Sequence, residues 1–336
     1  MKAVKITSPG KLELVNEAMP VIKENEALVK VSFGGICGSD LHIYHGKHER
    51  AKYPVIMCHE FSGEIVTLGE DVKGSWAIGD KVAVNPLIWC GICDPCTQGN
   101  THVCNKLGLI GIDIDGAFAQ YVKVKESQMV RLPDGLDMDT AALAEPLAVG
   151  VHAVVRSNLK VGDKVVILGG GPIGLMLAFA AQAAGAGLIA ISEISEFRLK
   201  KAEELGFKTI NAREKVKEKV MSMTNGIGAD IVFEAAAAPI TTEQMTGLLR
   251  TRGTAMIVGV HRQLVGTDLR DVNLRELNIR GTRVYTQRDF ETAVNLLPKL
   301  KDITNVITHR IPLEECEFGF QAAVAGKDSL KVLIKP

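Results

Sequence analysis

The amino-acid sequence predicts an α/β protein with two domains, one built from short strands in a barrel-like arrangement and one built on a doubly wound parallel sheet. The chain has 336 residues, more than one hydrophobic core usually serves. Up to about Pro133 it consists of short β-rich runs between glycine turns, with little helical periodicity. From Gly162 onward strands and helices alternate, which is typical of a parallel sheet covered by helices on both faces.

In the first domain, the expected strands include the runs Ala27–Phe33, Glu60–Leu68 and Lys81–Asn85. An alanine-rich helical segment follows Asp139. In the second domain, the expected strands are Val165–Leu168, Leu188–Ser192, Asp230–Glu234 and Thr254–Val260. The expected helices are Ile173–Ala184, Ser195–Leu205, Arg213–Met223 and Thr242–Leu249. The last fifty residues match neither the β-rich pattern nor the alternating pattern of strands and helices. They contain a helical run at Phe290–Leu300 and a strand at Leu330–Ile334, and we expect them to return to the first domain.

Composition and charge narrow the classes of function. Hydrophobic residues make up 46% of the chain and charged residues 23%, as in an ordinary globular enzyme. The 39 basic and 39 acidic residues cancel, so we expect no nucleic-acid partner. The N-terminus lacks the pattern of a signal peptide, and glycines and a proline break the most apolar stretch, Val165 to Gly187. We therefore expect a cytoplasmic protein with no membrane partner.

Four of the seven cysteines lie within fifteen residues, at Cys90, Cys93, Cys96 and Cys104. In a chain without secretory features this crowding favours a metal site over disulfides. Four thiolates can close a tetrahedron around Zn²⁺ and leave no position for substrate, so the predicted site is structural. The alternatives are chance clustering or an iron–sulfur site. Iron–sulfur runs usually carry a proline after the last cysteine, whereas Asn105 follows here.

A second, dispersed set consists of Cys37, His59, Glu60 and Glu145. Each residue alone has an ordinary explanation, as a small buried hydrophobe, a satisfied polar group or a helix boundary before Pro146. Together they would supply a thiolate, an imidazole and a carboxylate with one coordination position open, which is typical of catalytic zinc. The pattern alone does not establish that these residues meet in space.

The motif Gly169-x-Gly171-x-x-Gly174 follows an apolar strand and opens an apolar helix, and Glu193 ends the next expected strand. In this context the glycines allow a tight turn, close approach of a pyrophosphate and packing of helix on strand. Glu193 is then placed to accept hydrogen bonds from the adenosine ribose, and its charge would repel a 2′-phosphate. The motif therefore predicts NAD as the cofactor; the alternative is that Glu193 points to solvent.

These motifs occur in an order and spacing that resemble one protein family. The matching segments are Gly35-Ile-Cys-Gly-Ser-Asp40, His59-Glu60-Phe-Ser-Gly63, the four-cysteine lobe, Glu145-Pro146, Gly169-Gly-Gly-Pro-Ile-Gly174 and the terminal Lys-Val-Leu-Ile run. The chain resembles, over essentially its whole length, the zinc-containing medium-chain dehydrogenases, and within them the polyol, butanediol and threonine dehydrogenase branch. The resemblance implies a GroES-like β-barrel catalytic domain at 1–149 and 286–336, and a Rossmann domain that binds NAD at 150–285. It also implies two zinc ions per chain and a homodimer or homotetramer.

The resemblance further implies roles for individual residues. Cys37 and His59 would bind catalytic zinc, and either Glu60 or Glu145 would supply the carboxylate ligand. Ser39 would take the substrate proton, and His42 would end a relay to water. The residues implied for the cofactor are Gly169, Gly171, Pro172, Ile173, Gly174, Glu193 and Arg198.

Two segments depart from the pattern of the family. Cys58 stands where the family usually has a glycine, and we expect it to be a packed residue and not a ligand. Thr282–Tyr285 falls where the branch places substrate contacts, but it does not match the sorbitol enzymes closely. The expected activity is oxidation of a secondary hydroxyl in a polyol, vicinal diol or sugar acid to a ketone with NAD. The alternatives are an L-threonine 3-dehydrogenase-like enzyme and a non-catalytic protein that binds zinc and dinucleotide.

Overall fold

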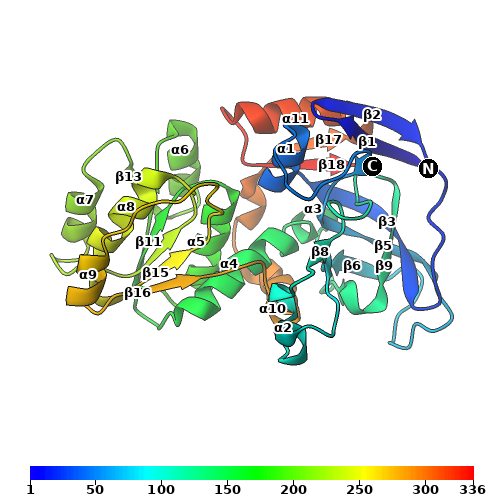
Figure 1. Ribbon diagram of the computed structural model, residues 1–336. Helices are drawn as coiled ribbons and strands as arrows, with labels where there is room; N and C mark the ends of the chain where they lie inside the picture. The colour runs from blue at the N-terminus through cyan, green and yellow to red at the C-terminus, as the bar shows by residue number, and fades with distance from the viewer. The chain divides into compact units, whose positions relative to one another are not determined.

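The chain divides into two units in a computed structural model that describes residues 1–336 (Figure 1). Unit 1 contains Met1–Glu145 together with Thr286–Pro336, and unit 2 contains Pro146–Tyr285. The last fifty residues thus belong to the same unit as the N-terminal segment. No helix is long and apolar enough to cross a membrane.

The main sheet of unit 1 is organised around β3 (Glu26–Gly35), which pairs antiparallel with β5 (Glu60–Leu68) and β9 (Tyr121–Lys125). At its C-terminal end β3 also pairs with β18 (Lys331–Lys335), which is how the end of the chain joins this sheet. The full strand order is β10 (Met129–Arg131), β6 (Lys81–Val84), β5, β3, β18 and β17 (Ile307–Pro312), with β9 on β3. Burial alternates along β9 with the period of two expected of a strand with one face on the core.

The remaining elements of unit 1 are short. Its other strands are β1 (Lys2–Ser8), β2 (Lys11–Asn16), β4 (Val55–Ile56), β6 (Lys81–Val84), β7 (Leu87–Ile88), β8 (Gly108–Leu109), β10 (Met129–Arg131) and β17 (Ile307–Pro312). Its helices are α1 (Gly38–Tyr44), α2 (Asp94–Thr97), α3 (Met138–Ala141), α10 (Gln287–Leu296) and α11 (Cys316–Ala325). Its 3₁₀ turns are η1 (Thr101–Val103), η2 (Glu126–Gln128), η3 (Leu297–Lys299), η4 (Ile303–Val306) and η5 (Leu313–Glu315). Helix α4 (Ala144–Ser157) begins at the end of the first segment of unit 1 and continues into unit 2.

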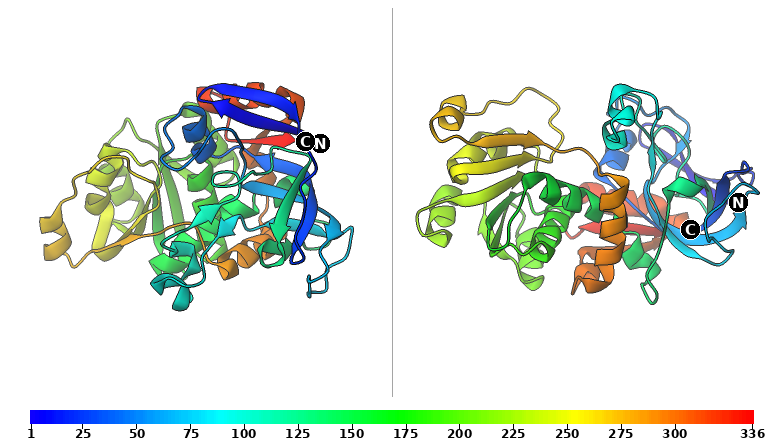
Figure 2. Two further views of the ribbon diagram at one scale, coloured as in Figure 1. Left: turned by 45° about the vertical axis from the view of Figure 1, so that its right-hand side comes forward. Right: turned by 90° about the horizontal axis from the view of Figure 1, so that it is seen from below.

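Unit 2 is a six-stranded parallel sheet in the order β13-β12-β11-β14-β15-β16, and Figure 2 shows helices beside its strands. The strands are β11 (Lys164–Leu168), β12 (Leu188–Glu193), β13 (Lys208–Asn211), β14 (Ala229–Glu234), β15 (Leu249–Ile257) and β16 (Asn278–Gly281). The helices are α5 (Pro172–Ala183), α6 (Glu196–Glu204), α7 (Val216–Met223), α8 (Pro239–Leu248) and α9 (Leu269–Leu274). Val165–Leu168 is fully buried, because a central parallel strand is covered on both faces. This order is the doubly wound arrangement that the alternation predicts.

Some boundaries in unit 2 differ from the sequence expectation. The strand expected at Thr254–Val260 begins five residues earlier, and α9 and β16 follow it without having been expected. Between Ala229 and Ile231 the register of β14 against β15 shifts, and Arg252 has a positive φ of 61°. Such an irregularity interrupts the alternation of side chains by which a strand is recognised in sequence. The residues before Thr254 therefore do not show a strand pattern in the sequence.

Candidate functional site

The dispersed set of sequence-predicted ligands forms a group in unit 1. One ligand atom each from Cys37, His59 and Glu60 lies within 4.8 Å of the others. Cys37 is the residue before α1, and Glu60 is the first residue of β5. Because Gly35 and Glu60 are paired across β3 and β5, the chain brings the segments before α1 and before β5 together. A side chain at Gly35 would lie 2.4 Å from Glu60 Oε2, so a larger residue there would have to displace the Glu60 carboxylate.

Only one of the two carboxylate oxygens of Glu60 has a partner within the protein. Its Oε2 lies 2.6 Å from Nζ of Lys331, which also donates a hydrogen bond to the carbonyl of Ile36 at 3.1 Å. Both side chains are buried, and Glu60 Oε1 accepts no hydrogen bond. A buried carboxylate oxygen without a partner is costly. An ion coordinated by this oxygen, the thiolate and the imidazole would satisfy it, so the residues present fit an open zinc site.

His59 is flanked on both of its ring nitrogens. Nδ1 lies 3.8 Å from Oδ1 of Asp40, whose Oδ2 accepts a hydrogen bond from the backbone of Cys37 at 2.8 Å. Nε2 lies 3.3 Å from the hydroxyl of Ser39. Burial alone would lower the pKa of His59, yet the adjacent Asp40 and Cys37 raise that pKa well above its usual value. A carboxylate behind an imidazole is the usual way to orient a histidine that binds metal, which leaves Nε2 for the ion.

Asp40 and Lys331 contact the candidate ligands His59 and Glu60, and the sequence motifs assigned neither of them a role. Asp40 had a local signal, because it stands three residues after Cys37 in the Gly-Ser-Asp segment. Burial raises the pKa of the Asp40 carboxyl, an effect that His59 partly offsets. Lys331 opens the terminal Lys-Val-Leu-Ile run of the family pattern, but no local pattern connects it with Glu60, from which it is 271 residues away along the chain.

Glu145 and His42 lie outside the group of three. Glu145 is the second residue of α4 and is buried, and its charge contributes to raising the pKa of both His59 and Lys331. It is therefore close to the site without being among the side chains within 4.8 Å of one another. His42 is exposed and stands in the last turn of α1.

The four cysteines of the lobe form a second group within 4.8 Å, made of Cys90, Cys93, Cys96 and Cys104. The chain folds back around them through α2 and η1, with positive φ at Gly91 and Gly99. Backbone N–H groups of Ile92 and Cys93 lower the pKa of Cys90 to about 6, whereas burial raises the pKa of Cys96 to about 12. Four sulfurs without an oxygen or nitrogen ligand fit a closed structural zinc site.

The glycine motif adopts the turn that its sequence requires. Gly169 has a φ of 109°, and a side chain at Gly174 would lie 1.9 Å from the carbonyl of Gly169. Pro172 and Ile173 are the first residues of α5, where a proline costs no hydrogen bond. The turn therefore presents the N-terminus of an apolar helix, the position at which such motifs bind phosphate.

Glu193 is bonded to the backbone around the glycine turn and does not point to solvent. Its Oε2 accepts a hydrogen bond from Gly170 N at 2.8 Å, and its Oε1 accepts bonds from Ile194 N and Ser195 N at 2.8 and 3.0 Å. Nη1 of Arg198 lies 4.0 Å from Glu193 Oε2. The carboxylate and the guanidinium thus lie together at the carboxyl end of β12.

Cys58 and Tyr285 are both buried. Cys58 has a φ of 86°, and its thiol faces the carbonyls of Gly35 and Glu60 at 3.7 and 3.6 Å. Burial raises the pKa of the Cys58 thiol well above its usual value, and the residue belongs to neither metal group. Tyr285 ends unit 2, and Arg283 is exposed.

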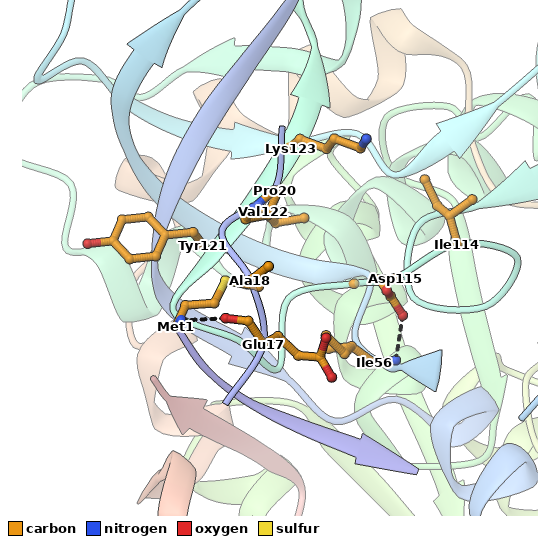
Figure 3. A pocket seen from close by; sticks show the side chains of 11 residues that line it. Met1, Glu17, Ala18, Pro20, Ile56, Ile114, Asp115, Tyr121, Val122 and Lys123 are labelled. Atoms are coloured by element: carbon orange, nitrogen blue, oxygen red, sulfur yellow. Dashed lines mark hydrogen bonds between the residues drawn. The ribbon is translucent and has the colours of Figure 1, made fainter. Parts of the chain in front are cut away.

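A cavity of about 300 Å³ in unit 1 is lined by none of these residues (Figure 3). Two of its polar groups are used within the protein. The amine of Met1 donates to the carbonyl of Glu17 at 2.6 Å, and Asp115 accepts a bond from Ile56 N at 2.9 Å. The cavity therefore contains none of the candidate ligands for metal or cofactor.

Two family descriptions match the chain. Residues 23–134 match the alcohol dehydrogenase GroES-like domain. Residues 172–299 match the zinc-binding dehydrogenase family. The segment between them contains Glu145 and all of β11, and the segment after them contains Lys331.

Curated relatives and solved structures agree with these families. The 2-dehydro-3-deoxy-L-galactonate 5-dehydrogenase of Pseudoalteromonas atlantica is 38% identical over 92% of this chain and 91% of its own. The L-threonine 3-dehydrogenase of Bacillus licheniformis is 36% identical over 99% of both chains. The crystal structure of 2R,3R-butanediol dehydrogenase from Bacillus subtilis is 31% identical, with a TM-score of 0.93 over 100% of this chain and 99% of that one.

Two further solved structures contain a nicotinamide cofactor. A putative zinc-binding dehydrogenase from Sinorhizobium meliloti was solved bound to NADP; it is 33% identical, with a TM-score of 0.91 over 100% of this chain and 99% of that one. An alcohol dehydrogenase from Escherichia coli was solved with NADH; it is 27% identical, with a TM-score of 0.93 over 100% of this chain and 99% of that one. Together with the ligand geometry, these matches show that the chain belongs to the zinc-binding dehydrogenases with a GroES-like domain and is an oxidoreductase that acts on CH–OH groups.

Proposed function

We propose that the protein oxidises a secondary hydroxyl group of a polyol, vicinal diol or sugar acid to a ketone, with NAD as the acceptor of hydride. The observation that carries the proposal is the open group of Cys37, His59 and Glu60, in which the buried Glu60 Oε1 lacks a partner. A thiolate, an imidazole and a carboxylate leave one coordination position for an alcohol. The four-cysteine lobe, by contrast, would hold a second zinc in a structural role.

Cys37, His59 and Glu60 would hold a zinc ion, with Glu145 as the second carboxylate near it. The ion would supply Lewis-acid chemistry that makes the hydroxyl of a bound alcohol more acidic. Asp40 would orient His59, and Lys331 balances the charge of Glu60 at Oε2. These residues set the geometry and charge of the site.

Ser39 and His42 handle the proton in this proposal. The Ser39 hydroxyl lies 3.3 Å from Nε2 of His59, next to the nitrogen that would face the ion. It is thus positioned to accept the proton of the alcohol, while the exposed His42 passes the proton to water. Ser39→Ala should reduce kcat roughly 10²–10⁴-fold, the usual contribution of a general base. His42→Ala should cost less, because water can replace a terminal base.

The preference for NAD rests on Glu193. Its carboxylate is anchored by three backbone N–H groups at the end of β12, so its negative charge cannot easily turn away from a 2′-phosphate. One solved structure of this fold contains NADP and another contains NADH, which makes this side chain the feature to test. Glu193→Ser should raise kcat/KM for NADP relative to NAD, with Arg198 available to the added phosphate. A native enzyme that uses NADP as well as NAD would contradict the assignment.

The substrate class is supported by charge in the site and by the relatives. Glu60 and Glu145 place two buried carboxylates at the site, and a polar lining of this kind suits a substrate with several hydrogen-bonding groups. The named relatives act on a sugar acid, threonine and butanediol. A site that hydrogen-bonds a substrate hydroxyl rejects an analogue lacking it by up to ~10⁴. The proposal therefore predicts a large advantage of a vicinal diol over the matching mono-alcohol.

The decisive experiment is a substrate panel of diols, polyols, sugar acids and threonine, with NAD and with NADP, followed by absorbance at 340 nm. Cys37→Ser serves as the inactive control. Threonine as the best substrate would favour the second candidate, a threonine 3-dehydrogenase, which the relative from Bacillus licheniformis supports. A mono-alcohol that matches every diol and sugar acid would overturn the polar-substrate assignment. No turnover with any member, in protein that contains zinc, would favour a non-catalytic role.

A further inference from the structure

The sheet of unit 2 has two halves with different tasks in binding a dinucleotide. In a sheet of this order, each half binds one mononucleotide at the carboxyl ends of its strands. The glycine turn and Glu193 belong to the half formed by β11, β12 and β13. The half formed by β14, β15 and β16 is then left for the nicotinamide mononucleotide. Its carboxyl edge contains a buried polar cluster that neither the metal site nor the glycine motif uses.

Glu234, the last residue of β14, forms the centre of this cluster and is fully buried. Its Oε1 accepts hydrogen bonds from Ala236 N at 3.1 Å, Ala237 N at 2.9 Å and the hydroxyl of Thr241 at 2.7 Å. Ala237 has a φ of 53°, a conformation that favours glycine. The carboxylate therefore holds the turn after β14 in a shape that its alanines would not adopt alone.

This turn lies directly against the glycine motif. A side chain at Gly169 would lie 3.1 Å from Ala236 N and 3.2 Å from the carbonyl carbon of Ala235. Ala235 N also donates to the carbonyl of Leu168, the last residue of β11. The turn that Glu234 holds is thus in contact with the turn at which the pyrophosphate is expected. A shift in one would be felt by the other.

His261 connects the same carboxylate to the segment after β15. Its Nε2 lies 3.2 Å from Glu234 Oε2 and 3.2 Å from the hydroxyl of Thr242. Glu234 Oε2 is buried and accepts no hydrogen bond, so the imidazole 3.2 Å away is the charged or polar ring that faces it. Val258 N and Gly259 N both donate to the backbone carbonyl of Glu234 at 2.9 Å. The side chain of His261 is only 13% exposed, so it closes the cluster from the side of β15.

We propose that Glu234 and His261 are a pair of positioning residues for the nicotinamide half of the dinucleotide. Glu234 fixes the backbone of the turn after β14, and His261 connects the segment after β15 to that turn. The two segments that would contact the nicotinamide half therefore keep a fixed position relative to each other. The inference rests on the proposed use of a nicotinamide dinucleotide. It adds that the nicotinamide half is bound by a preformed edge whose geometry depends on one buried contact between a carboxylate and an imidazole.

The experiment compares two ligands that differ in the nicotinamide half. NADH contains both halves, whereas 5′-AMP contains only the adenosine half, and both are titrated into the zinc-containing protein by calorimetry. In His261→Leu the ring is lost and Glu234 Oε2 is left buried and unpaired. The Kd for NADH should rise about tenfold or more, the usual effect of leaving a charged group unmatched. The Kd for 5′-AMP should stay within about twofold, because that ligand lacks both the nicotinamide mononucleotide and the pyrophosphate.

Two further variants separate positioning from general damage. His261→Gln keeps an amide donor that can reach Glu234, so it should restore most of the affinity for NADH. Glu243→Gln changes an exposed carboxylate on α8 and should leave both affinities unchanged. The melting temperature of each variant is recorded alongside.

Three results would overturn the inference. If His261→Leu weakens both ligands equally, the pair is structural. If it weakens neither while wild-type protein binds NADH, the pair does not position the nicotinamide half, and the proposed function stands. If wild-type protein binds neither ligand, the proposed function fails and the inference fails with it.

Discussion

Replacing Lys331 with methionine tests how the carboxylate of the metal site is held. Lys331 is 2% exposed, Glu60 is fully buried, and their charged atoms are 2.6 Å apart. Lys331→Met keeps an apolar stem of similar length but leaves the charge of Glu60 buried without its partner. Removing one member of such a pair typically costs 3–5 kcal/mol, so we expect a loss of about 4 kcal/mol in the free energy of unfolding.

The magnitude also predicts a shift in melting temperature. For a domain of 150–250 residues, about 1 kcal/mol corresponds to 2–4 °C, so unit 1 should melt about 10 °C lower in the variant. The comparison is made after zinc is removed with a chelator, because a bound cation would replace part of the missing positive charge. Urea denaturation followed by far-UV circular dichroism gives the free energy, and calorimetry gives the melting temperature.

The double variant Glu60→Gln with Lys331→Met isolates the cause. If the cost comes from an unpaired buried charge, neutralising Glu60 should recover most of the lost stability. A double variant as unstable as Lys331→Met alone would refute the reasoning and assign the loss to packing. A single variant that loses less than about 1 kcal/mol would show that water reaches Glu60 and that the pair behaves as a surface ion pair.

Three more outcomes follow from the geometry. Gly174→Ala should abolish NADH binding in calorimetry, because its side chain would meet the Gly169 carbonyl at 1.9 Å; binding that persists would mean that α5 can shift. Cys58→Ala should retain the wild-type zinc content in metal analysis, since the Cys58 thiol belongs to neither ligand group, and the loss of one ion would make it a ligand. In zinc-free protein at pH 7.5, iodoacetamide should alkylate Cys90 before Cys96. The lowered pKa of Cys90, about 6, makes it a thiolate at this pH, whereas the pKa of Cys96 is about 12; equal rates by peptide mass spectrometry would contradict this order.

Features encoded within a short stretch of chain were predictable from the sequence. Gly169 to Gly174 determines its own turn, because the spacing of the glycines and the flanking apolar runs decide the backbone locally. The four cysteines likewise group within fifteen residues, since the turns that join them lie inside the segment. The alternation of strands and helices after Gly162 also predicts a doubly wound sheet, and the observed strand order agrees.

Contacts between distant parts of the chain were decided only by the tertiary structure. Lys331 meets Glu60 because β18 pairs with the end of β3, and no local pattern specifies which strand closes a sheet. The same holds for Glu234 and His261, which follow different strands and meet at one edge.

The sequence by itself identified the side chains that could bind metal and dinucleotide, because ligand spacing and glycine turns are local properties. It left Glu60 and Glu145 as equal candidates for the carboxylate. The tertiary structure placed Glu60 with Cys37 and His59, and gave it the counter-charge of Lys331. Burial and charge compensation depend on what packs around a group, and that environment is assembled from segments hundreds of residues apart.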